Sequence, residues 1–226
     1  ELLLKIGLLA SDATVDVASG ASVGDPTEIA LVNWGGMHQT DANSVRSQFP
    51  RLGELAFDSD RKLMSTLHRV NGKPMLLTKG AMDVLLARSG KLLTAKGVVP
   101  LTDEMRTAIA RANEEFSENG LRVLAFACRE MDAERELTLE DENGFTFVGL
   151  VSMIDPPREE SKQAVADAKR GGIRTVMITG DHKVTATAIA KQIGIFEEGD
   201  MALEGVELDA MTDDELDEKL TRISVY

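Results

Sequence analysis

The chain is poor in cysteine, in aromatic residues and in long apolar runs. Cys128 is its single cysteine, so no disulfide can form within the chain, which is usual in a reducing compartment such as the cytosol. No stretch approaches the ~18 uncharged apolar residues of a membrane-spanning helix, and no basic segment followed by an apolar one indicates a secretory leader. We therefore expect this chain to lie in the cytosol.

The motifs of several nucleotide and metal sites are also missing. The sequence has neither a Walker A loop nor a GxGxxG fingerprint. Its three histidines, His38, His68 and His182, do not pair at metal-ligand spacing, and Cys128 is far from all of them along the chain. This pattern excludes a zinc site and a Cys–His nucleophile, and we expect no metal site within the chain.

Positive charge is scarce. Lys and Arg number 25 against 38 Asp and Glu, giving a net charge of -13, so a phosphate backbone would be repelled and nucleic acid is not an expected partner. Residues 197–218 include 11 acidic residues and neither Lys nor Arg. Their spacing is not that of a calcium loop, and we interpret this segment as a solvated surface. A chain this acidic must place its few cations locally if it binds a nucleotide.

The order of the apolar runs predicts an α/β fold in two domains. Residues 1–143 show an α+β pattern with mainly antiparallel strands, and Asn71-Gly72 is the favoured two-residue hairpin turn. From residue 144 the pattern changes to strand, helix, strand, helix, which is typical of a parallel sheet. Strands are expected at 53–57, 63–70, 75–78, 121–128, 145–154 and 173–178. Helices are expected at 2–9, 25–34, 81–87, 102–118, 157–170 and 181–193.

Two turns of the second domain are candidates for chemistry. Thr179-Gly180-Asp181 lies where a strand meets a helix, and the free N–H groups of a helix start can bind a phosphate. Asp181 could equally be a plain helix cap. Asp155 follows the preceding strand, in the turn Asp155-Pro156-Pro157-Arg158, which is equally consistent with a functional turn and with a rigid hinge.

The first domain has its own candidates. Phe57 precedes the basic pair Arg61-Lys62; an exposed phenyl ring can stack on a purine, and a lysine can meet a phosphate. The alternative is a core phenylalanine beside surface cations. Lys79-Gly80 ends a strand, where glycine permits close approach of a ligand or of backbone, although Lys79 could be an ordinary surface lysine.

Glu28 and Arg122 each have two interpretations. Glu28 could serve a ligand, or it could complete a capping box begun at Asp25. Arg122 opens an apolar strand, and its guanidinium could pair with a phosphate or with any acidic group.

Six motifs, taken in order, resemble the type II P-type ATPases over nearly the whole chain. They are Gly24-Asp25-Pro26-Thr27-Glu28, Phe57-Asp58-Ser59-Asp60-Arg61-Lys62, Lys79-Gly80-Ala81, Arg122-Val123-Leu124, Asp155-Pro156-Pro157-Arg158 and Thr179-Gly180-Asp181. The second motif, with Leu63-Met64-Ser65-Thr66 after it, is most similar to the calcium-pumping branch, bacterial forms included.

The resemblance implies a nucleotide-binding domain over residues 1–143 and part of a Rossmann-like phosphorylation domain, of haloacid dehalogenase type, over residues 144–226. It implies an ATP or ADP site in which Phe57 stacks on adenine, Glu28 lies by the adenine amino group, Lys62, Lys79 and Gly80 line the pocket, Arg122 reaches a phosphate and Leu124 backs the pocket. In the second domain it implies that Asp155 opens the phosphorylation side and that Thr179, Gly180 and Asp181 position the phosphate.

The family transfers a phosphoryl group from ATP, with Mg²⁺, to an aspartate of an Asp-Lys-Thr-Gly-Thr motif, and this drives cation transport. That motif is absent here, as is the later Gly-Asp-Gly-x-Asn-Asp magnesium motif, so we expect an inactive cytoplasmic fragment of an integral membrane pump, most simply a calcium pump. Its partners would be the remaining phosphorylation, actuator and membrane domains. Ser59 stands where animal reticulum pumps usually carry arginine, so one phosphate contact is missing or supplied from elsewhere.

Two other interpretations remain. A stand-alone nucleotide-binding module is disfavoured because the second domain would be an incomplete sheet. A haloacid dehalogenase-like phosphatase, with residues 1–143 as its cap, would need an N-terminal Asp-x-Asp nucleophile, and the sequence has no Asp-x-Asp before Asp58-Ser59-Asp60.

Overall fold

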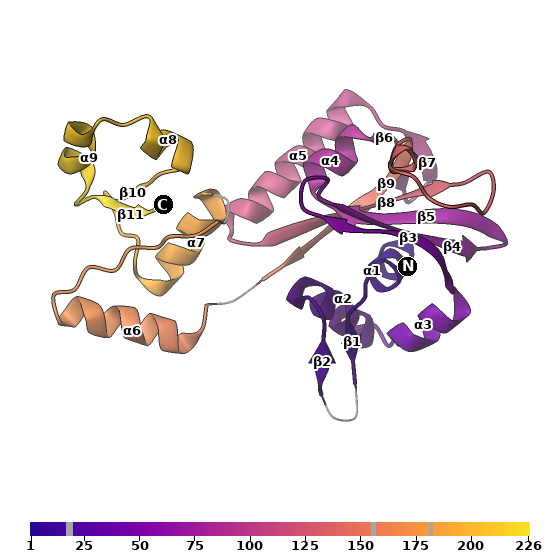
Figure 1. Cartoon of the computed structure of the whole chain (residues 1–226), viewed down its shortest axis with the longest axis horizontal. Coiled ribbons are helices and arrows are strands. Elements are labelled where there is room, and N and C mark those ends of the chain that lie inside the picture. Colours follow the sequence, from indigo (N-terminus) through magenta and orange to yellow (C-terminus); the bar gives the residue numbers. More distant parts are fainter. Residues whose placement is uncertain (17–19, 155–156, 181–182) are drawn as a thin grey trace. The chain divides into compact units, whose positions relative to one another are not determined.

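The computed structural model describes residues 1–16, 20–154, 157–180 and 183–226. They form two compact units (Figure 1). The first comprises residues 1–113 and 123–151, and the second comprises residues 114–122 and 152–226. This structural division falls near residue 151, whereas the sequence pattern placed the boundary near residue 144.

A seven-stranded mixed sheet is the centre of the first unit. Its spatial order is β3-β4-β5-β8-β9-β6-β7. The strands are β3 (Arg51–Asp58), β4 (Leu63–Val70), β5 (Lys73–Gly80), β8 (Arg122–Glu130), β9 (Phe145–Met153), β6 (Ser89–Thr94) and β7 (Gly97–Pro100). The pairings β3–β4, β4–β5, β5–β8 and β6–β7 are antiparallel, and β6–β9 is parallel. The expected α/β class and the mainly antiparallel first sheet are confirmed.

The Asn71-Gly72 turn joins β4 to β5 as predicted. Val70 pairs with Lys73 across it, and both turn residues have positive φ, 52° for Asn71 and 78° for Gly72. A two-residue hairpin of this kind requires positive φ at both positions, and asparagine and glycine adopt it most easily.

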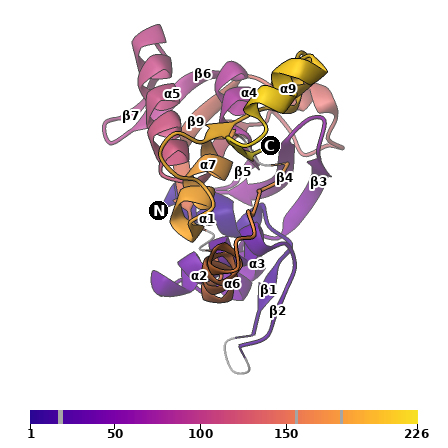
Figure 2. The same cartoon turned by 90° about the vertical axis from the view of Figure 1, so that its left-hand side faces the viewer.

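Helices cover both faces of the sheet (Figures 1 and 2). One face carries α4 (Met82–Ala87) and α5 (Asp103–Glu118), and its core includes Leu63, Leu67 and Leu76 packed with side chains from these helices. The opposite face carries α1 (Leu2–Leu9), α2 (Pro26–Met37) and α3 (Ala42–Gln48). Because side chains alternate along a strand, β5 sends Leu76 and Thr78 to the first face, and Leu77 and Lys79 to the second.

Helix α2 begins at the predicted cap. The Asp25 carboxylate accepts a hydrogen bond of 2.8 Å from the Thr27 N–H, and Pro26 occupies the first helical position. Several short elements of the first unit were not predicted from the sequence. They are α3, the pair β1 (Thr14–Val15) and β2 (Ser22–Val23), the β6–β7 hairpin, and the 3-10 turn Leu139–Asp141.

The two strands expected to begin the parallel sheet of the second domain are the main error of the sequence prediction. Strand β9 lies in the first sheet, beside β6 and β8, so it does not begin a second one. Residues 173–178 form no strand; Met177 makes an isolated parallel bridge to Val225, and Ile173 and Ile178 are exposed. An apolar run becomes a strand only where a neighbouring strand supplies a hydrogen-bond ladder.

The second unit is helical with one small parallel pair. It contains α6 (Glu159–Arg170), α7 (Lys183–Ile193), β10 (Met201–Ala202), α8 (Gly205–Asp209), α9 (Asp213–Lys219) and β11 (Ile223–Val225). Strands β10 and β11 pair in parallel, and Ala186, Ala190 and Val225 form its buried centre. Among the described residues, no helix has the length and apolar character needed to span a membrane.

Candidate functional site

Four neighbouring strands bring the predicted site residues of the first unit to one end of the sheet. Leu63, at the start of β4, pairs with Gly80, at the end of β5, and Gly80 pairs with Ala125 near the start of β8. Phe57 lies near the end of β3, and Leu124 directly precedes Ala125. Because these strands run antiparallel, Phe57, Leu63, Gly80 and Leu124 lie at the same end of the four strands although they are far apart in the sequence. We call this end of the strands the edge of the sheet.

The turn between β3 and β4 carries Lys62. Asp58 organises this turn, since its carboxylate accepts hydrogen bonds from the N–H groups of Asp60 (3.1 Å) and Arg61 (2.8 Å). The Lys62 N–H donates to the Asp58 carbonyl at 2.6 Å. Lys62 has a φ of 57°, the left-handed region that side chains other than glycine rarely adopt. The exposed Lys62 side chain is therefore presented by a turn with a defined geometry.

Gly80 is required by the backbone of this turn. A Cβ at position 80 would lie 2.3 Å from the Lys62 carbonyl oxygen and 2.6 Å from a Leu63 side-chain carbon. The Ala81 N–H also donates to the Lys62 carbonyl at 3.1 Å. Of the two approaches that the sequence left open, ligand or backbone, the structure shows the backbone approach.

Phe57 is exposed over 62% of its surface. The interpretation of Phe57 as a core residue is therefore wrong. A large aromatic ring left in solvent, on the strand that leads into a turn with an exposed lysine, is a surface on which a planar base can stack.

Lys79 and Glu28 form an ion pair beneath this edge of the sheet. Their side chains are only 7% and 13% exposed. The Lys79 ammonium also donates to the Ser11 hydroxyl at 3.2 Å. Burial lowers the pKa of Lys79, and the Glu28 carboxylate opposes that shift. The interpretation of Lys79 as an ordinary surface lysine is therefore wrong.

Glu28 also holds the connection between α1 and β1. One carboxylate oxygen accepts hydrogen bonds from the N–H groups of Asp12 (2.7 Å) and Ala13 (3.0 Å), while the other faces Lys79. Both oxygens are thus used away from the start of α2, so the capping-box interpretation is wrong. Gly24 packs against the same connection, because a Cβ there would lie 2.7 Å from the Ala13 Cα.

Arg61 points inward and pairs with a carboxylate that the sequence did not single out. Its guanidinium contacts Glu142, which is fully buried, at 2.5 Å, and it donates to the Ala56 carbonyl. No sequence signal marks Glu142, which is one of several acidic residues before β9. Arg61 is therefore paired with Glu142 and does not stand in for the arginine that the resemblance implies at position 59.

Arg122 and Leu124 are separated by the division into units. Leu124 belongs to the first unit and is half-buried in β8, whereas Arg122 begins the strand, is exposed and belongs to the second unit. Leu124 therefore lies at the edge described above, and the role of Arg122 remains a prediction.

In the second unit, Thr179 and Gly180 line a cavity of about 360 Å³ at the start of α7, together with Lys183, Glu204 and Tyr226. The Lys183 ammonium donates to Glu207 at 2.7 Å. Asp181 and Asp155, the other residues expected here, lie outside the described residues, so their predicted roles remain predictions.

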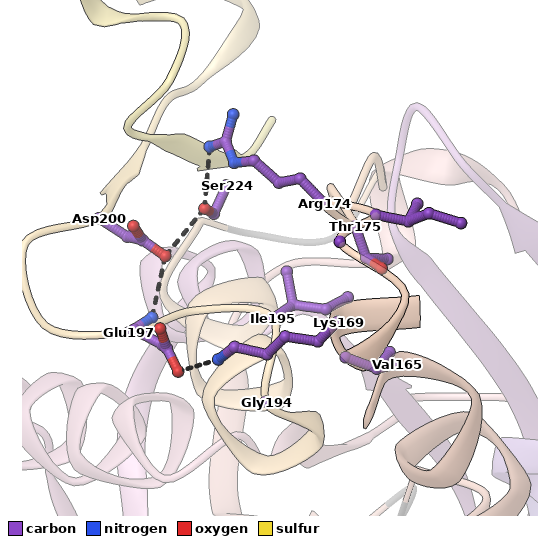
Figure 3. Close-up of a pocket in the computed structure, with 11 residues that line it drawn as sticks. Val165, Lys169, Arg174, Thr175, Gly194, Ile195, Glu197, Asp200 and Ser224 are labelled. Atoms are coloured by element: carbon purple, nitrogen blue, oxygen red, sulfur yellow. Dashed lines mark hydrogen bonds and ion pairs between the residues drawn. The ribbon is translucent and has the colours of Figure 1, made fainter. Parts of the chain in front are cut away.

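A second cavity of this unit, of about 310 Å³, contains none of the predicted residues. Figure 3 shows its polar side chains bonded to one another: Arg174 to Ser224 at 3.2 Å, Ser224 to Asp200 at 2.9 Å, and Lys169 to Glu197. Each charged side chain drawn takes part in one of these bonds, so we assign the cavity no ligand. Across the described ranges, no group of three His, Cys, Asp or Glu side chains gathers as metal ligands.

Comparison with known proteins decides the family. A family model described as the cytoplasmic domain N of P-type ATPases matches residues 1–160. The chain belongs to this family. The resemblance inferred from the six motifs is therefore confirmed.

The curated relatives are much longer than this chain. A calcium-transporting ATPase of Listeria monocytogenes is 48% identical over 99% of the chain, and one of Lactococcus lactis is 47% identical over all of it. A cation-transporting ATPase of Synechocystis is 39% identical over 96% of the chain. The chain spans about a quarter of each relative's length: 26%, 26% and 24%, respectively.

Proposed function

We propose that the first unit binds the adenine base and phosphates of ATP or ADP at the edge formed by β3, β4, β5 and β8. The observation that carries this proposal is the convergence of an exposed Phe57, an exposed Lys62 and the buried Lys79–Glu28 pair at that edge, in a chain with a net charge of -13.

Each residue has a physical role in this proposal. Phe57 offers a ring face for the base, and Leu124 adds apolar surface on β8. Lys62 supplies an exposed cation for a phosphate. Lys79 contributes positive charge from beneath the edge and fixes Glu28, whose carboxylate keeps acceptor capacity for the amino group of adenine. Gly80 lets the Lys62 turn lie close to β5.

For the whole protein, we propose the reaction of a P-type ATPase that transports calcium, as the names of the bacterial relatives suggest. Such an enzyme would use ATP with Mg²⁺, and its acceptor aspartate and magnesium motif are not in this sequence. Residues 144–226 would then be part of the phosphorylation domain, with Thr179 and Gly180 near the transferred phosphate and Asp155 and Asp181 as further site residues. Arg122, at the start of β8, would reach a phosphate of the nucleotide. The remaining phosphorylation, actuator and membrane domains would be its partners, and this chain would lie on the cytoplasmic side.

Calorimetric titration of the 226-residue chain with ATP and ADP tests the nucleotide site. Phe57→Ala should weaken binding by roughly 1–3 kcal/mol, the usual contribution of one stacked base. Leu139→Ala is a matched control, because Leu139 is also 62% exposed but lies in the 3-10 turn Leu139–Asp141. Unchanged affinity in Phe57→Ala would place the base elsewhere and contradict the proposal.

The same chain should not be phosphorylated by ATP and Mg²⁺, because it supplies the binding half of the proposed site only. Incubation with γ-labelled ATP followed by acid precipitation measures this. Labelling of a carboxylate of this chain would show that the acceptor lies within it and would favour the phosphatase-like interpretation.

A further inference from the structure

Glu142 is a fully buried carboxylate, 81 residues away from Arg61 in the sequence, that contacts the turn between β3 and β4. One of its oxygens, Oε1, accepts a hydrogen bond of 2.7 Å from the Ser65 hydroxyl and contacts the Arg61 guanidinium at 2.5 Å. Ser65 in turn shares a hydrogen bond of 2.8 Å with Thr78 of the adjacent strand. The carboxylate is therefore bonded to the turn and to β4, and through Ser65 it is linked to β5.

The hydrogen bonds to the Glu142 carboxylate satisfy only one of its two oxygens. The other oxygen of Glu142, Oε2, has no hydrogen-bond partner among the described residues, and an Arg88 guanidinium nitrogen lies 3.6 Å from it. A buried carboxylate is costly unless it is paired, so the Arg61 contact is the main compensation for its charge. Because moving the Arg61 guanidinium away would leave this buried charge without its closest contact, Glu142 restricts where that guanidinium can lie.

Arg61 also restricts the conformation of the turn between β3 and β4. Its guanidinium reaches Glu142 with one nitrogen and the Ala56 carbonyl with another. Ala56 directly precedes Phe57, and Arg61 directly precedes Lys62. One guanidinium thus ties together the two ends of the segment that presents the exposed ring and the exposed cation.

We propose that Glu142, acting through Arg61, is a positioning residue for the nucleotide site: it fixes the spacing of Phe57 and Lys62. The inference rests on the proposed nucleotide function of this edge. Glu142 and Arg61 themselves touch no nucleotide; they determine how far apart the two contacting side chains are held.

Nucleotide titrations of three variants test the inference at a temperature where each is folded. Glu142→Gln keeps the size of the side chain but removes its charge, and Arg61→Lys keeps the charge but loses the two-pronged contact. Each should weaken ATP binding about threefold or more, the range of coupling expected within one hydrogen-bond network. Asp141→Asn is the matched control, because Asp141 is a buried neighbour of Glu142 that is bonded to Arg135 and Thr138 and not to the turn. It should lower stability and leave affinity unchanged.

A double-mutant cycle separates positioning from general destabilisation. In a Phe57→Ala background, Glu142→Gln should cause less than half of its fold-change in affinity, because one of the two side chains that it positions is gone. Equal affinity of Glu142→Gln and the unaltered chain, with Phe57→Ala still weakened, would overturn the inference and leave the proposed function standing. Equal losses in Glu142→Gln and Asp141→Asn would also overturn it. Absence of nucleotide binding in the unaltered chain would refute both.

Discussion

Lys79 and Glu28 are 51 residues apart in the sequence, and their side chains meet in an ion pair that is almost closed to solvent. The pair joins β5 to α2 beneath the edge of the sheet that we propose as the nucleotide site. The Glu28 carboxylate compensates the charge of Lys79, which explains how this lysine can be buried.

Removing one partner of this pair should be costly. We expect Lys79→Met to lower the free energy of unfolding by about 3–5 kcal/mol, because it leaves the Glu28 charge buried without its cation. The double variant with Glu28→Gln should be less destabilised than Lys79→Met alone, since the amide oxygen can still accept from Asp12 and Ala13. Urea unfolding measures both.

Lys73→Met is the control for that comparison. Lys73 pairs with Glu130 at 2.7 Å, but the two side chains are 61% and 55% exposed. Such a pair contributes about 1 kcal/mol or less. A loss in Lys73→Met as large as that in Lys79→Met would show that burial does not determine the effect.

Gly80→Ala should displace the turn that carries Lys62. The added Cβ would meet the Lys62 carbonyl oxygen at 2.3 Å, a backbone atom that cannot simply rotate away. We expect a loss of about 1–3 kcal/mol in the free energy of unfolding, together with weaker ATP binding. Gly90→Ala is the control, because a Cβ at Gly90 meets nothing within 4 Å; a similar loss there would contradict the steric explanation.

Cys128 should make the protein less stable at alkaline pH. Burial raises the pKa of its thiol from 9.0 to about 11. The unfolded chain therefore loses this proton at lower pH than the folded chain, so the free energy of unfolding falls as pH rises from 9 to 11, by roughly 2–3 kcal/mol in total. Comparing urea unfolding of the unaltered chain with that of Cys128→Val at pH 8 and pH 11 isolates this contribution. The lowered pKa of Lys79 acts in the opposite direction, and it is present in both chains. An identical pH dependence of the two chains would show that Cys128 does not titrate in this way.

Thr179→Ala tests the second unit in the full-length ATPase. If the Thr179 hydroxyl donates to the transferred phosphate, the rate of phosphorylation by ATP should fall about tenfold or more, whereas ATP affinity should not change. Thr187→Ala is the control within α7, the helix that follows Thr179, because the Thr187 hydroxyl donates to the Lys183 carbonyl at 2.7 Å. Equal rates in Thr179→Ala and Thr187→Ala would remove Thr179 from the phosphate site.

The sequence by itself determined those helices, strands and turns that depend on residues a few positions apart. The Asn71-Gly72 hairpin, the Asp25 cap of α2 and the strand Leu63–Val70 were predictable because turn geometry, capping and alternation act over a few residues. The motif order also indicated which residues of the first unit gather at one place, among them Phe57, Lys62 and Gly80.

Only the tertiary structure determined which side chains Lys79 and Arg61 contact. The partners of Lys79 and Arg61 are 51 and 81 residues away, and no short-range pattern identifies Glu28 as the partner of Lys79 or Glu142 as the partner of Arg61. The same limit explains the errors at residues 145–153 and 173–178. Both runs are apolar enough to form strands, but the available neighbouring strand determines whether and where an apolar run forms a ladder, and the order of strands in space is a property of the whole fold.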